Sequence, residues 1–213
     1  MWLVAGGLAV FGLGFLAFRV EGQRRPRPMA MRFEQFFLDN PFRKRFFGAD
    51  QVIRQLGDVK GFTVGEIGTG VGMVVDLLAR AVGDEGRVFG VDIQEEAILR
   101  TVRRLSRSSL ADRATIDQAD AANLPWPGLA MDRVVMVAVL GEIPEARQPA
   151  VFHEVMRVLK PDGKVLVTEL WPDPHYISRS RLLARLMDFG FQIERISGGR
   201  MIYHVLASPR SVL

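Results

Sequence analysis

The feature that most constrains the fold of this 213-residue chain is an alternation of short β-rich runs and longer amphipathic runs after residue 61. Alternation of this kind is typical of a parallel sheet with helices on both faces. The expected strands are 62–67, 87–91, 114–118, 133–139, 164–170, 191–196 and 201–207. The expected helices are 72–82, 95–107, 149–159 and 180–189.

The last two expected strands differ from the others because no helical run separates them. The residues between them, Ser197-Gly198-Gly199, are typical of a tight turn that joins antiparallel neighbours. The sequence therefore predicts an α/β fold in which a parallel sheet ends in an antiparallel hairpin.

A glycine-rich loop, residues 68–72, stands where the first expected strand becomes a helix. Glycines there accept positive φ angles and let a ligand approach the backbone. Asp92 ends the second strand, where a carboxylate can accept both hydroxyls of a ribose. Asp120 and Ala121 follow the third strand, where an acid and an amide can meet an adenine edge. Since the carboxyl ends of parallel strands share one edge, we expect a nucleoside site there.

The loop distinguishes between two nucleoside cofactors. Dinucleotide sites have the pattern Gly-x-Gly-x-x-Gly, whereas the third glycine here comes one residue early. Glu66 also brings a negative charge to the start of the loop, which suits an ammonium group and opposes a diphosphate. A dehydrogenase would further need a hydride-transfer site, and we find no Tyr-x-x-x-Lys helix. These features favour S-adenosyl-L-methionine (SAM) over NAD.

Four segments resemble the motifs of the class I SAM-dependent methyltransferases. They are VGEIGTGVG at 64–72, VFGVDIQ at 88–94, QADAANLPWP at 118–127 and HEVMRVLKPDGKVLV at 153–167. The resemblance extends over about residues 60–207. It implies a Rossmann-like, seven-stranded, mostly parallel sheet with a reversed C-terminal hairpin. It also implies an enzyme that consumes SAM and releases S-adenosyl-L-homocysteine.

The resemblance implies cofactor-binding roles residue by residue. Those implied for the methionine moiety are Glu66, Gly68, Thr69 and Gly70. Those implied for the nucleoside are Asp92 at the ribose hydroxyls, Ile93 against the adenine, and Asp120 and Ala121 at the adenine edge. Gly72 is implied to permit close approach of the helix, and Val137 is implied to lie beside the sulfonium.

The chain departs from the family pattern at three places, of which Asp162, where the usual residue is Gly, is expected to have no functional effect. Gly65 stands where Leu or Val is usual, which we expect to loosen the first strand. Many quinone-type relatives carry a His pair after the fourth strand, whereas residues 140–144 here read LGEIP. The resemblance therefore does not imply which molecule receives the methyl group.

Candidate catalytic residues follow the fourth and fifth strands. SAM is an activated donor, so the protein mainly positions the acceptor, and a base is needed only for an acceptor that loses a proton early. The candidates are Glu142, His175 and Tyr176, with Asp173 and Glu169 nearby. Structural alternatives stay open for all three: a helix-start acid, a surface histidine and a packing tyrosine. His153 and His204 are expected to be structural, and no metal site is predicted.

An uncharged run of seventeen residues, Trp2–Phe18, precedes the domain. As a helix it would be about 26 Å long, near the lower limit for spanning a bilayer. We predict a transmembrane anchor at 1–20 and, because arginines follow it directly, a catalytic domain on the cytoplasmic side. A cleavable signal peptide lacks a basic start and a cleavage site here, and a buried soluble helix would contain four glycines.

The segment 21–58 is predicted to be a basic linker followed by Phe-rich amphipathic helices, ahead of a methyltransferase domain at 59–213. Six of the fourteen phenylalanines lie between residues 33 and 47. Asn40 and Pro41 are typical of a helix start, and Gly57 of its end. Two interpretations are compatible: a cover packed on the domain, and a face in contact with lipid head groups.

Charge and composition exclude several classes. The net charge is +4, but residues 19–47 contribute +5, so the remainder is −1, which argues against a nucleic-acid partner. Cysteine is absent, which excludes disulfides, thiolate nucleophiles and Cys-based metal sites. We therefore predict methyl transfer to a small, hydrophobic or lipid-like acceptor at the membrane. The alternatives are a methyltransferase for soluble molecules that is merely tethered, and a non-catalytic SAM-binding regulator. No oligomeric state is predicted.

Overall fold

The structure is a computed structural model that describes residues 20–22, 49–171 and 173–210. Its helices are α4 (Ala49–Leu56), α5 (Met73–Ala81), α6 (Glu95–Arg107), α7 (Gln148–Val158) and α8 (Arg179–Asp188). Three short 3-10 helices are η1 (Ala111–Arg113), η2 (Leu140–Glu142) and η3 (Glu145–Arg147). The strands are β1 (Thr63–Ile67), β2 (Arg87–Asp92), β3 (Ala114–Gln118), β4 (Met131–Val137), β5 (Leu159–Leu170), β6 (Phe191–Gly198) and β7 (Ile202–Pro209).

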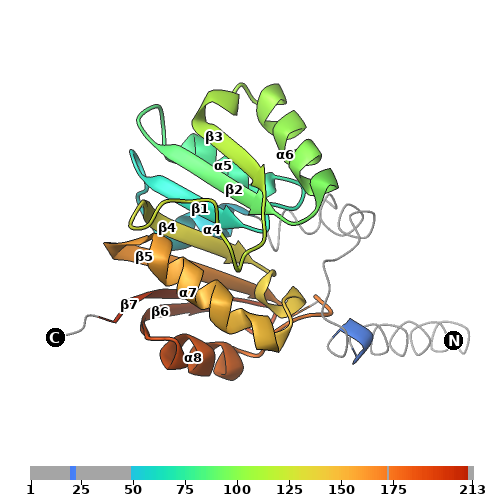
Figure 1. Ribbon diagram of the computed structural model, residues 1–213, viewed down its shortest axis with the longest axis vertical. Coiled ribbons are helices and arrows are strands. Elements are labelled where there is room, and N and C mark those ends of the chain that lie inside the picture. The colour runs from blue at the N-terminus through green and yellow to red at the C-terminus, as the bar shows by residue number, and fades with distance from the viewer. Residues whose placement is uncertain (1–19, 23–48, 172, 211–213) are drawn as a thin grey trace, which may run out of the picture.

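The described strands form one seven-stranded sheet in the order β3-β2-β1-β4-β5-β7-β6 (Figure 1). Strands β1 to β5 pair in parallel, and β7 runs antiparallel to both β5 and β6. The predicted mostly parallel sheet with a C-terminal antiparallel hairpin is confirmed. Because β1 to β5 are parallel, their carboxyl ends share one edge of the sheet. The strand order reverses between β1 and β4, and open α/β sheets bind ligands at the carboxyl edge beside such a reversal.

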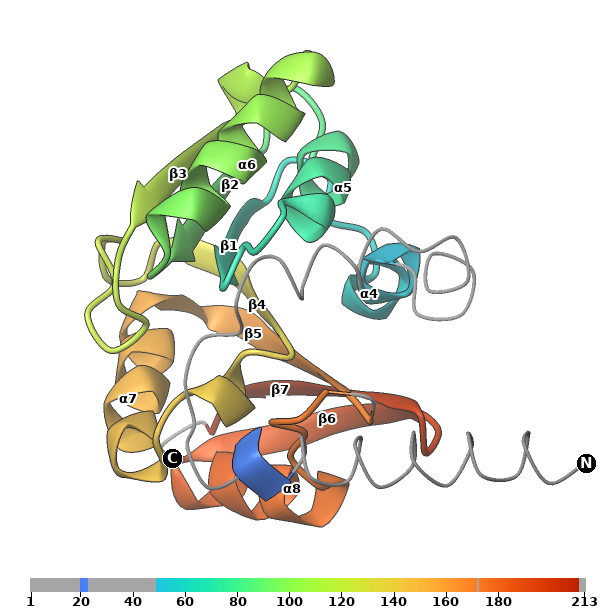
Figure 2. The ribbon, with the colours of Figure 1, turned by 90° about the vertical axis from the view of Figure 1, so that its right-hand side faces the viewer.

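Helices cover both faces of the sheet, as Figure 2 shows. On one face, α4, α5 and α6 bury apolar side chains such as Val52, Leu78 and Leu105 against the strands. On the other face, α7 and α8 bury Phe152 and Leu186 in a second core cluster. These two cores hold the strands rigidly, and the loops at their carboxyl ends are thereby positioned.

Several details differ from expectation, among them the start of β5 at Leu159 in place of residue 164. Strand β4 begins and ends two residues earlier than predicted, because Met131 pairs with Leu159 and because Ala138 adopts a φ of 55° that ends the strand. Gly65 does not leave β1 loosely packed. A Cβ there would lie 2.6 Å from Cζ3 of Trp126, so the buried indole occupies the space that a larger residue would fill.

The predicted anchor at 1–20 lies almost wholly outside the described residues, as do the linker and the Phe-rich segment up to residue 48. Of the helix that was expected to end near Gly57, the described part is α4, and Gly57 has a φ of 76° that suits a C-terminal glycine. Within the part of the chain that the structure describes, no helix has the length and apolar character needed to cross a bilayer.

Candidate functional site

The glycine-rich loop between β1 and α5 is shaped by three left-handed glycines. Gly68, Gly70 and Gly72 have φ angles of 79°, 51° and 74°. A Cβ on Gly68 would lie 2.2 Å from a methyl carbon of Val139, and one on Gly72 would lie 2.8 Å from the Cα of Thr101 in α6. The glycines therefore satisfy both the backbone conformation and the close packing against neighbouring segments. The close approach implied for Gly72 is present, with α6 as the neighbour.

Two carboxyl groups flank this loop. Asp92, at the end of β2, accepts hydrogen bonds from the backbone N–H of Gly70 (2.9 Å) and of Gln94 (2.9 Å). Burial raises the pKa of Asp92, and these backbone donors partly oppose the rise. Burial raises the pKa of Glu66 well above its ordinary value, and the nearby Asp92 carboxylate raises it further. The loop thus begins between two acids that lack a cation among the described residues.

Unsatisfied buried atoms at this loop fit the methionine moiety of SAM. Oε2 of Glu66 and Oγ1 of Thr69 are buried and make no hydrogen bond to any residue that the structure describes. Buried polar atoms rarely stay without a partner, because their desolvation is costly. An amino-acid ammonium would supply both a donor and a positive charge beside Glu66. The residues present are therefore compatible with SAM at this loop.

The adenine-binding residues implied by the resemblance also lie at strand ends. Ile93 directly follows β2 and is 49% exposed, which leaves its side chain available for packing on a flat ring. Ala121 lies half-buried after β3, next to Asp120. Asp120 accepts a hydrogen bond from the backbone N–H of Ala122 (2.9 Å) and pairs with Arg147 (2.7 Å). The Ala122 amide and the Arg147 guanidinium lower the pKa of Asp120.

The segment after β4 begins with a strained backbone. Val137 ends β4, and Ala138 has a φ of 55° while its N–H donates to the Thr168 carbonyl (2.8 Å). A left-handed conformation costs a non-glycine residue on the order of 1–2 kcal/mol. Glu142 ends the 3-10 helix η2 that follows, and is half-buried. The left-handed conformation of Ala138 turns the chain at the point where the resemblance implies the sulfonium of SAM.

The loop after β5 brings two further predicted residues to the same place. The Asp173 carboxylate accepts the His175 N–H (2.7 Å) and lies 3.5 Å from His175 Nδ1. A Cβ on Gly141 would lie 1.8 Å from the His175 carbonyl oxygen, so the backbones of the two loops touch. His175 is buried, unlike a surface loop histidine, and its Nδ1 has no hydrogen-bond partner among the described residues. Tyr176 packs edge-on against Tyr203, with ring centroids 5.9 Å apart.

Glu169 lies beneath this loop. Its side chain is 1% exposed, and one carboxyl oxygen accepts the N–H of Ile177 (3.2 Å). The other oxygen has no hydrogen-bond partner in the described part of the chain. Burial raises the pKa of Glu169 to about 8, and Asp173 contributes in the same direction. The carboxyl is therefore largely protonated at neutral pH.

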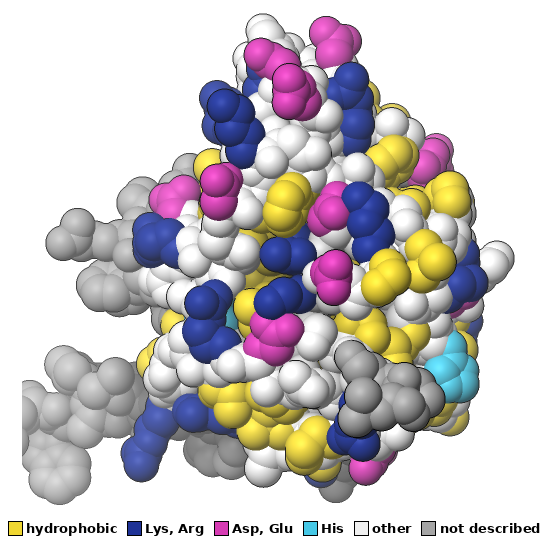
Figure 3. All heavy atoms as spheres, turned by 90° about the vertical axis from the view of Figure 1, so that its left-hand side faces the viewer, with side chains coloured by type: hydrophobic (Ala, Val, Ile, Leu, Met, Phe, Trp, Pro, Cys, Tyr) yellow, Lys and Arg dark blue, Asp and Glu magenta, His cyan; other side chains and the backbone are white. Residues whose placement is uncertain are grey.

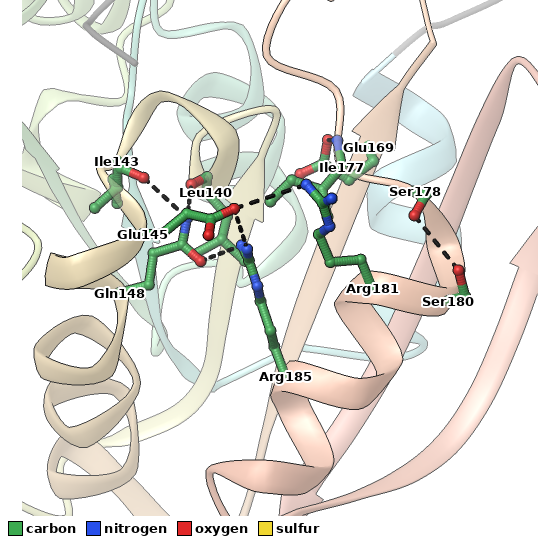
Figure 4. Close-up of polar contacts among 10 residues, drawn as sticks. All are labelled: Leu140, Ile143, Glu145, Gln148, Glu169, Ile177, Ser178, Ser180, Arg181 and Arg185. Carbon is green, nitrogen blue, oxygen red and sulfur yellow. Dashed lines mark hydrogen bonds and ion pairs between the residues drawn. The ribbon is translucent and has the colours of Figure 1, made fainter. Parts of the chain in front are cut away.

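A brace of side chains, shown in Figure 4, holds the segment after β4. Nε2 of the buried Gln148 donates to the carbonyls of Leu140 (2.9 Å) and Ile143 (2.9 Å). Arg185, from α8, donates to the Gln148 side-chain oxygen and to Glu145 (2.7 Å). The brace ties α7 and α8 to the loop that carries Glu142. No motif in the sequence marked Gln148, Arg185 or Arg147.

The two histidines expected to be structural both have contacts within the domain. His204, paired in β7 with Thr168 of β5, has its Nδ1 2.9 Å from the Thr168 hydroxyl, and burial lowers the pKa of His204 to about 4. The His153 ring meets the Phe189 ring edge-on, with centroids 6.3 Å apart. The structure thus gives His204 a hydrogen-bonding contact and His153 a packing contact.

Comparison with known proteins identifies the domain. Residues 64–163 match the family described as "Methyltransferase domain". The chain is 33% identical over 130 residues to a demethylmenaquinone methyltransferase of Lactobacillus johnsonii, covering 61% of this chain and 50% of that protein. It is 28% identical over 127 residues to a ubiquinone/menaquinone biosynthesis C-methyltransferase of Shewanella halifaxensis, covering 60% of this chain and 50% of that protein. The chain thus spans about half the length of the curated relatives it matches.

Solved structures share the fold. A SAM-dependent methyltransferase from Aquifex aeolicus superposes with a TM-score of 0.76 at 23% identity, covering 84% of this chain and 98% of that one. A glycopeptide N-methyltransferase, MtfA, solved with SAM, superposes with a TM-score of 0.64 at 14% identity, covering 76% of this chain and 87% of that one. Residues 64–163 therefore resemble a methyltransferase domain, and the fold is the one that solved SAM-dependent methyltransferases share.

Proposed function

We propose that this chain transfers a methyl group from SAM to a small, hydrophobic, quinone-like or lipid-like acceptor at a membrane surface. The observation that carries the proposal is that Glu66, a buried carboxyl whose Oε2 has no hydrogen-bond partner among the described residues, meets the glycine loop and Asp92 at one edge of the sheet. The curated relatives that act on quinone precursors support the acceptor class.

The chemistry divides between cofactor and protein. When bound, SAM supplies an activated methyl on a positively charged sulfur. The protein would supply position: Glu66 and Thr69 would hold the ammonium, Asp92 would hold the ribose hydroxyls, and the segment after β4 would orient the acceptor. Orientation of this kind contributes on the order of 7–11 kcal/mol to bimolecular reactions.

Two residues on the acceptor side are candidates to hold or move a proton. Glu142 is half-buried after β4, and Nδ1 of His175, beside Asp173, has no hydrogen-bond partner within the described part of the chain. If the acceptor is a phenol-like ring, its hydroxyl proton must leave as the ring becomes nucleophilic, and either group could accept it. Tyr176 contributes through packing on Tyr203, which orients the loop that carries His175.

The membrane part of the proposal rests on the sequence. The apolar run Trp2–Phe18 precedes a basic segment, which supports an anchor with the domain on the cytoplasmic side. The acceptor would then be drawn from the lipid phase.

The test is incubation of the full chain with deuteriomethyl-labelled SAM and a bacterial total extract, followed by mass spectrometry of the organic and aqueous phases. We expect the label in an organic-phase molecule for the wild type and for the surface control Asp112→Asn, and its loss in Asp92→Asn. Label only in the aqueous phase would replace the lipid-like acceptor by a soluble one. SAM binding without any labelled product would indicate a non-catalytic regulator.

A further inference from the structure

An exposed apolar surface lies at the end of the β6–β7 hairpin. Trp171, directly after β5, is 41% exposed, and Met201, directly before β7, is 47% exposed. The Trp171 N–H donates to the Met201 carbonyl (2.9 Å), so the two residues are neighbours although thirty positions separate them. Arg200, also exposed, precedes Met201 in the same turn. We call Trp171, Arg200 and Met201 the hairpin-tip surface.

The loop that follows Trp171 contacts the described piece of the N-terminal segment, residues 20–22. A Cβ on Gly22 would lie 2.8 Å from the Cβ of Pro174, three residues after Trp171. The seventeen-residue apolar run ends at Phe18. Because neighbouring Cα atoms are about 3.8 Å apart, the four peptide links from Phe18 to Gly22 span at most about 15 Å. Only a short stretch of chain therefore separates the apolar run from Gly22, the residue that contacts the loop after β5.

The composition of the surface matches the boundary of a bilayer. Trp is enriched at membrane interfaces because its ring is apolar and its N–H is polar. Arginine favours anionic head groups, and Arg200 places one such side chain on the surface beside Met201. The face drawn in Figure 3 carries acidic and basic side chains interspersed with hydrophobic ones.

We propose that the hairpin-tip surface docks on an anionic lipid bilayer and so holds the edge that carries His175 and Glu142 toward the membrane. The inference rests on the membrane part of the proposed function and is independent of methyl transfer. It specifies an orientation: the carboxyl edge of the sheet faces the lipid, and the opposite edge faces water.

The absence of cysteine permits a direct test with the full chain. A spin label attached to Met201→Cys or Trp171→Cys would report whether each position contacts lipid or water. Met187→Cys is the matched control, because Met187 is also 47% exposed but lies next to the start of β6, at the other end of the hairpin. The vesicles contain phosphatidylcholine and phosphatidylglycerol, and the collision rates with oxygen and with an aqueous nickel complex are measured.

We expect the labels at 201 and 171 to lose contact with the nickel complex when vesicles are added, while the label at 187 keeps it. Equal nickel contact at all three positions overturns the proposal, and so does a chain that stays in the aqueous phase. Shielding of position 187 to the same degree also overturns it, because no defined orientation would then exist. Binding of SAM, measured by calorimetry on the same samples, reports separately on the methyltransferase site.

Discussion

The ends of β1 to β3 and the loops after β4 and β5 form two halves of one edge, and different forces hold them. In the cofactor half, the backbone amides of Gly70, in the glycine loop, and of Gln94 donate to Asp92, so neighbouring strand ends suffice. In the acceptor half, Gln148 and Arg185 extend from α7 and α8 to hold the segment after β4. The cofactor half is thus held by contacts between strand ends, and the acceptor half by side chains of two helices, of which α8 is distant in the sequence.

Each half also buries a carboxyl group with a raised pKa. Glu66 stands beside Asp92 at the glycine loop, where a cationic ligand could compensate its charge. Glu169 lies under the loop after β5, where its proton keeps it neutral. Burial therefore raises the pKa of a carboxyl group in both halves, next to a charged neighbour in the cofactor half and beneath a packed loop in the acceptor half.

The largest expected effect tests Glu169. Burial raises its pKa to about 8, above the ordinary 4.5. Between these pH values the folded chain holds a proton that the unfolded chain has lost. The contribution to stability is therefore complete below about pH 4.5 and declines as the pH rises to about 8, by at most about 5 kcal/mol. Glu169→Gln should remove this decline, as measured by urea unfolding at pH 5, 7 and 9.

The control for that series is Glu96→Gln, an exposed residue of α6, which should keep the pH profile of the wild type. If the free energy of unfolding depends on pH in the same way in the wild type and in Glu169→Gln, the Glu169 carboxyl is ionised in the folded chain. That result would contradict the argument that burial raises its pKa.

The second prediction tests where the two halves touch. Gly68→Ala places a Cβ 2.2 Å from Val139 at a φ of 79°, whereas Gly61→Ala meets nothing within 4 Å at a similar φ of 75°. Both variants incur the left-handed strain of about 1–2 kcal/mol. Gly68→Ala adds overpacking of about 1–3 kcal/mol and should also weaken SAM binding. Unfolding in urea and calorimetry with SAM would compare them, and equal losses would exclude the steric contact.

The third prediction separates the halves. Gln148→Leu leaves the carbonyls of Leu140 and Ile143 without their donor, which should cost about 2–3 kcal/mol of unfolding free energy. Because the cofactor half is held by contacts between its own strand ends, the affinity for SAM should change little, whereas the rate of methyl transfer should fall. Gln192→Leu, on the exposed side of β6, is the control. A parallel loss of SAM affinity would show that the halves are one cooperative unit.

The smallest expected effect concerns the ion pair between the halves. Arg147 is about half exposed and Asp120 about one third exposed, so solvent screens their attraction. A double-mutant cycle with Arg147→Ala and Asp120→Asn should give a coupling free energy below about 1 kcal/mol. A larger coupling in the presence of SAM than in its absence would show that the cofactor strengthens the link between the halves.

Prediction from sequence succeeded for the mostly parallel sheet with its antiparallel hairpin, and the cofactor-binding roles of the strand-end residues stay predictions. Glycines, strand-terminal acids and β-rich runs act within a few residues, so their spacing predicted the loop and the strands, whereas the order of the strands came from the structure. The bounds of β4 were missed by two residues because the left-handed Ala138 has no local signal in the sequence. Gly65 was misjudged because its packing partner, Trp126, lies sixty-one positions away.

The acceptor half was only partly accessible to the same reasoning. Glu142 and His175 were selected because they follow adjacent strands, and their loops do meet at Gly141. Their roles in catalysis stay predictions. Gln148 and Arg185 were not selected, since a glutamine in one helix and an arginine in another carry no pattern until the sheet brings the helices together.

The sequence by itself determined the alternation that makes a parallel sheet, the edge at which its strands end, and the glycine and acid positions at that edge. Only the tertiary structure decided that Trp126 packs on Gly65, that Glu169 and His175 are buried, and that Gly22 lies against Pro174. The physical reason is range: backbone conformation and periodicity are set by near neighbours, whereas burial and side-chain partnership depend on segments that meet only in the folded chain.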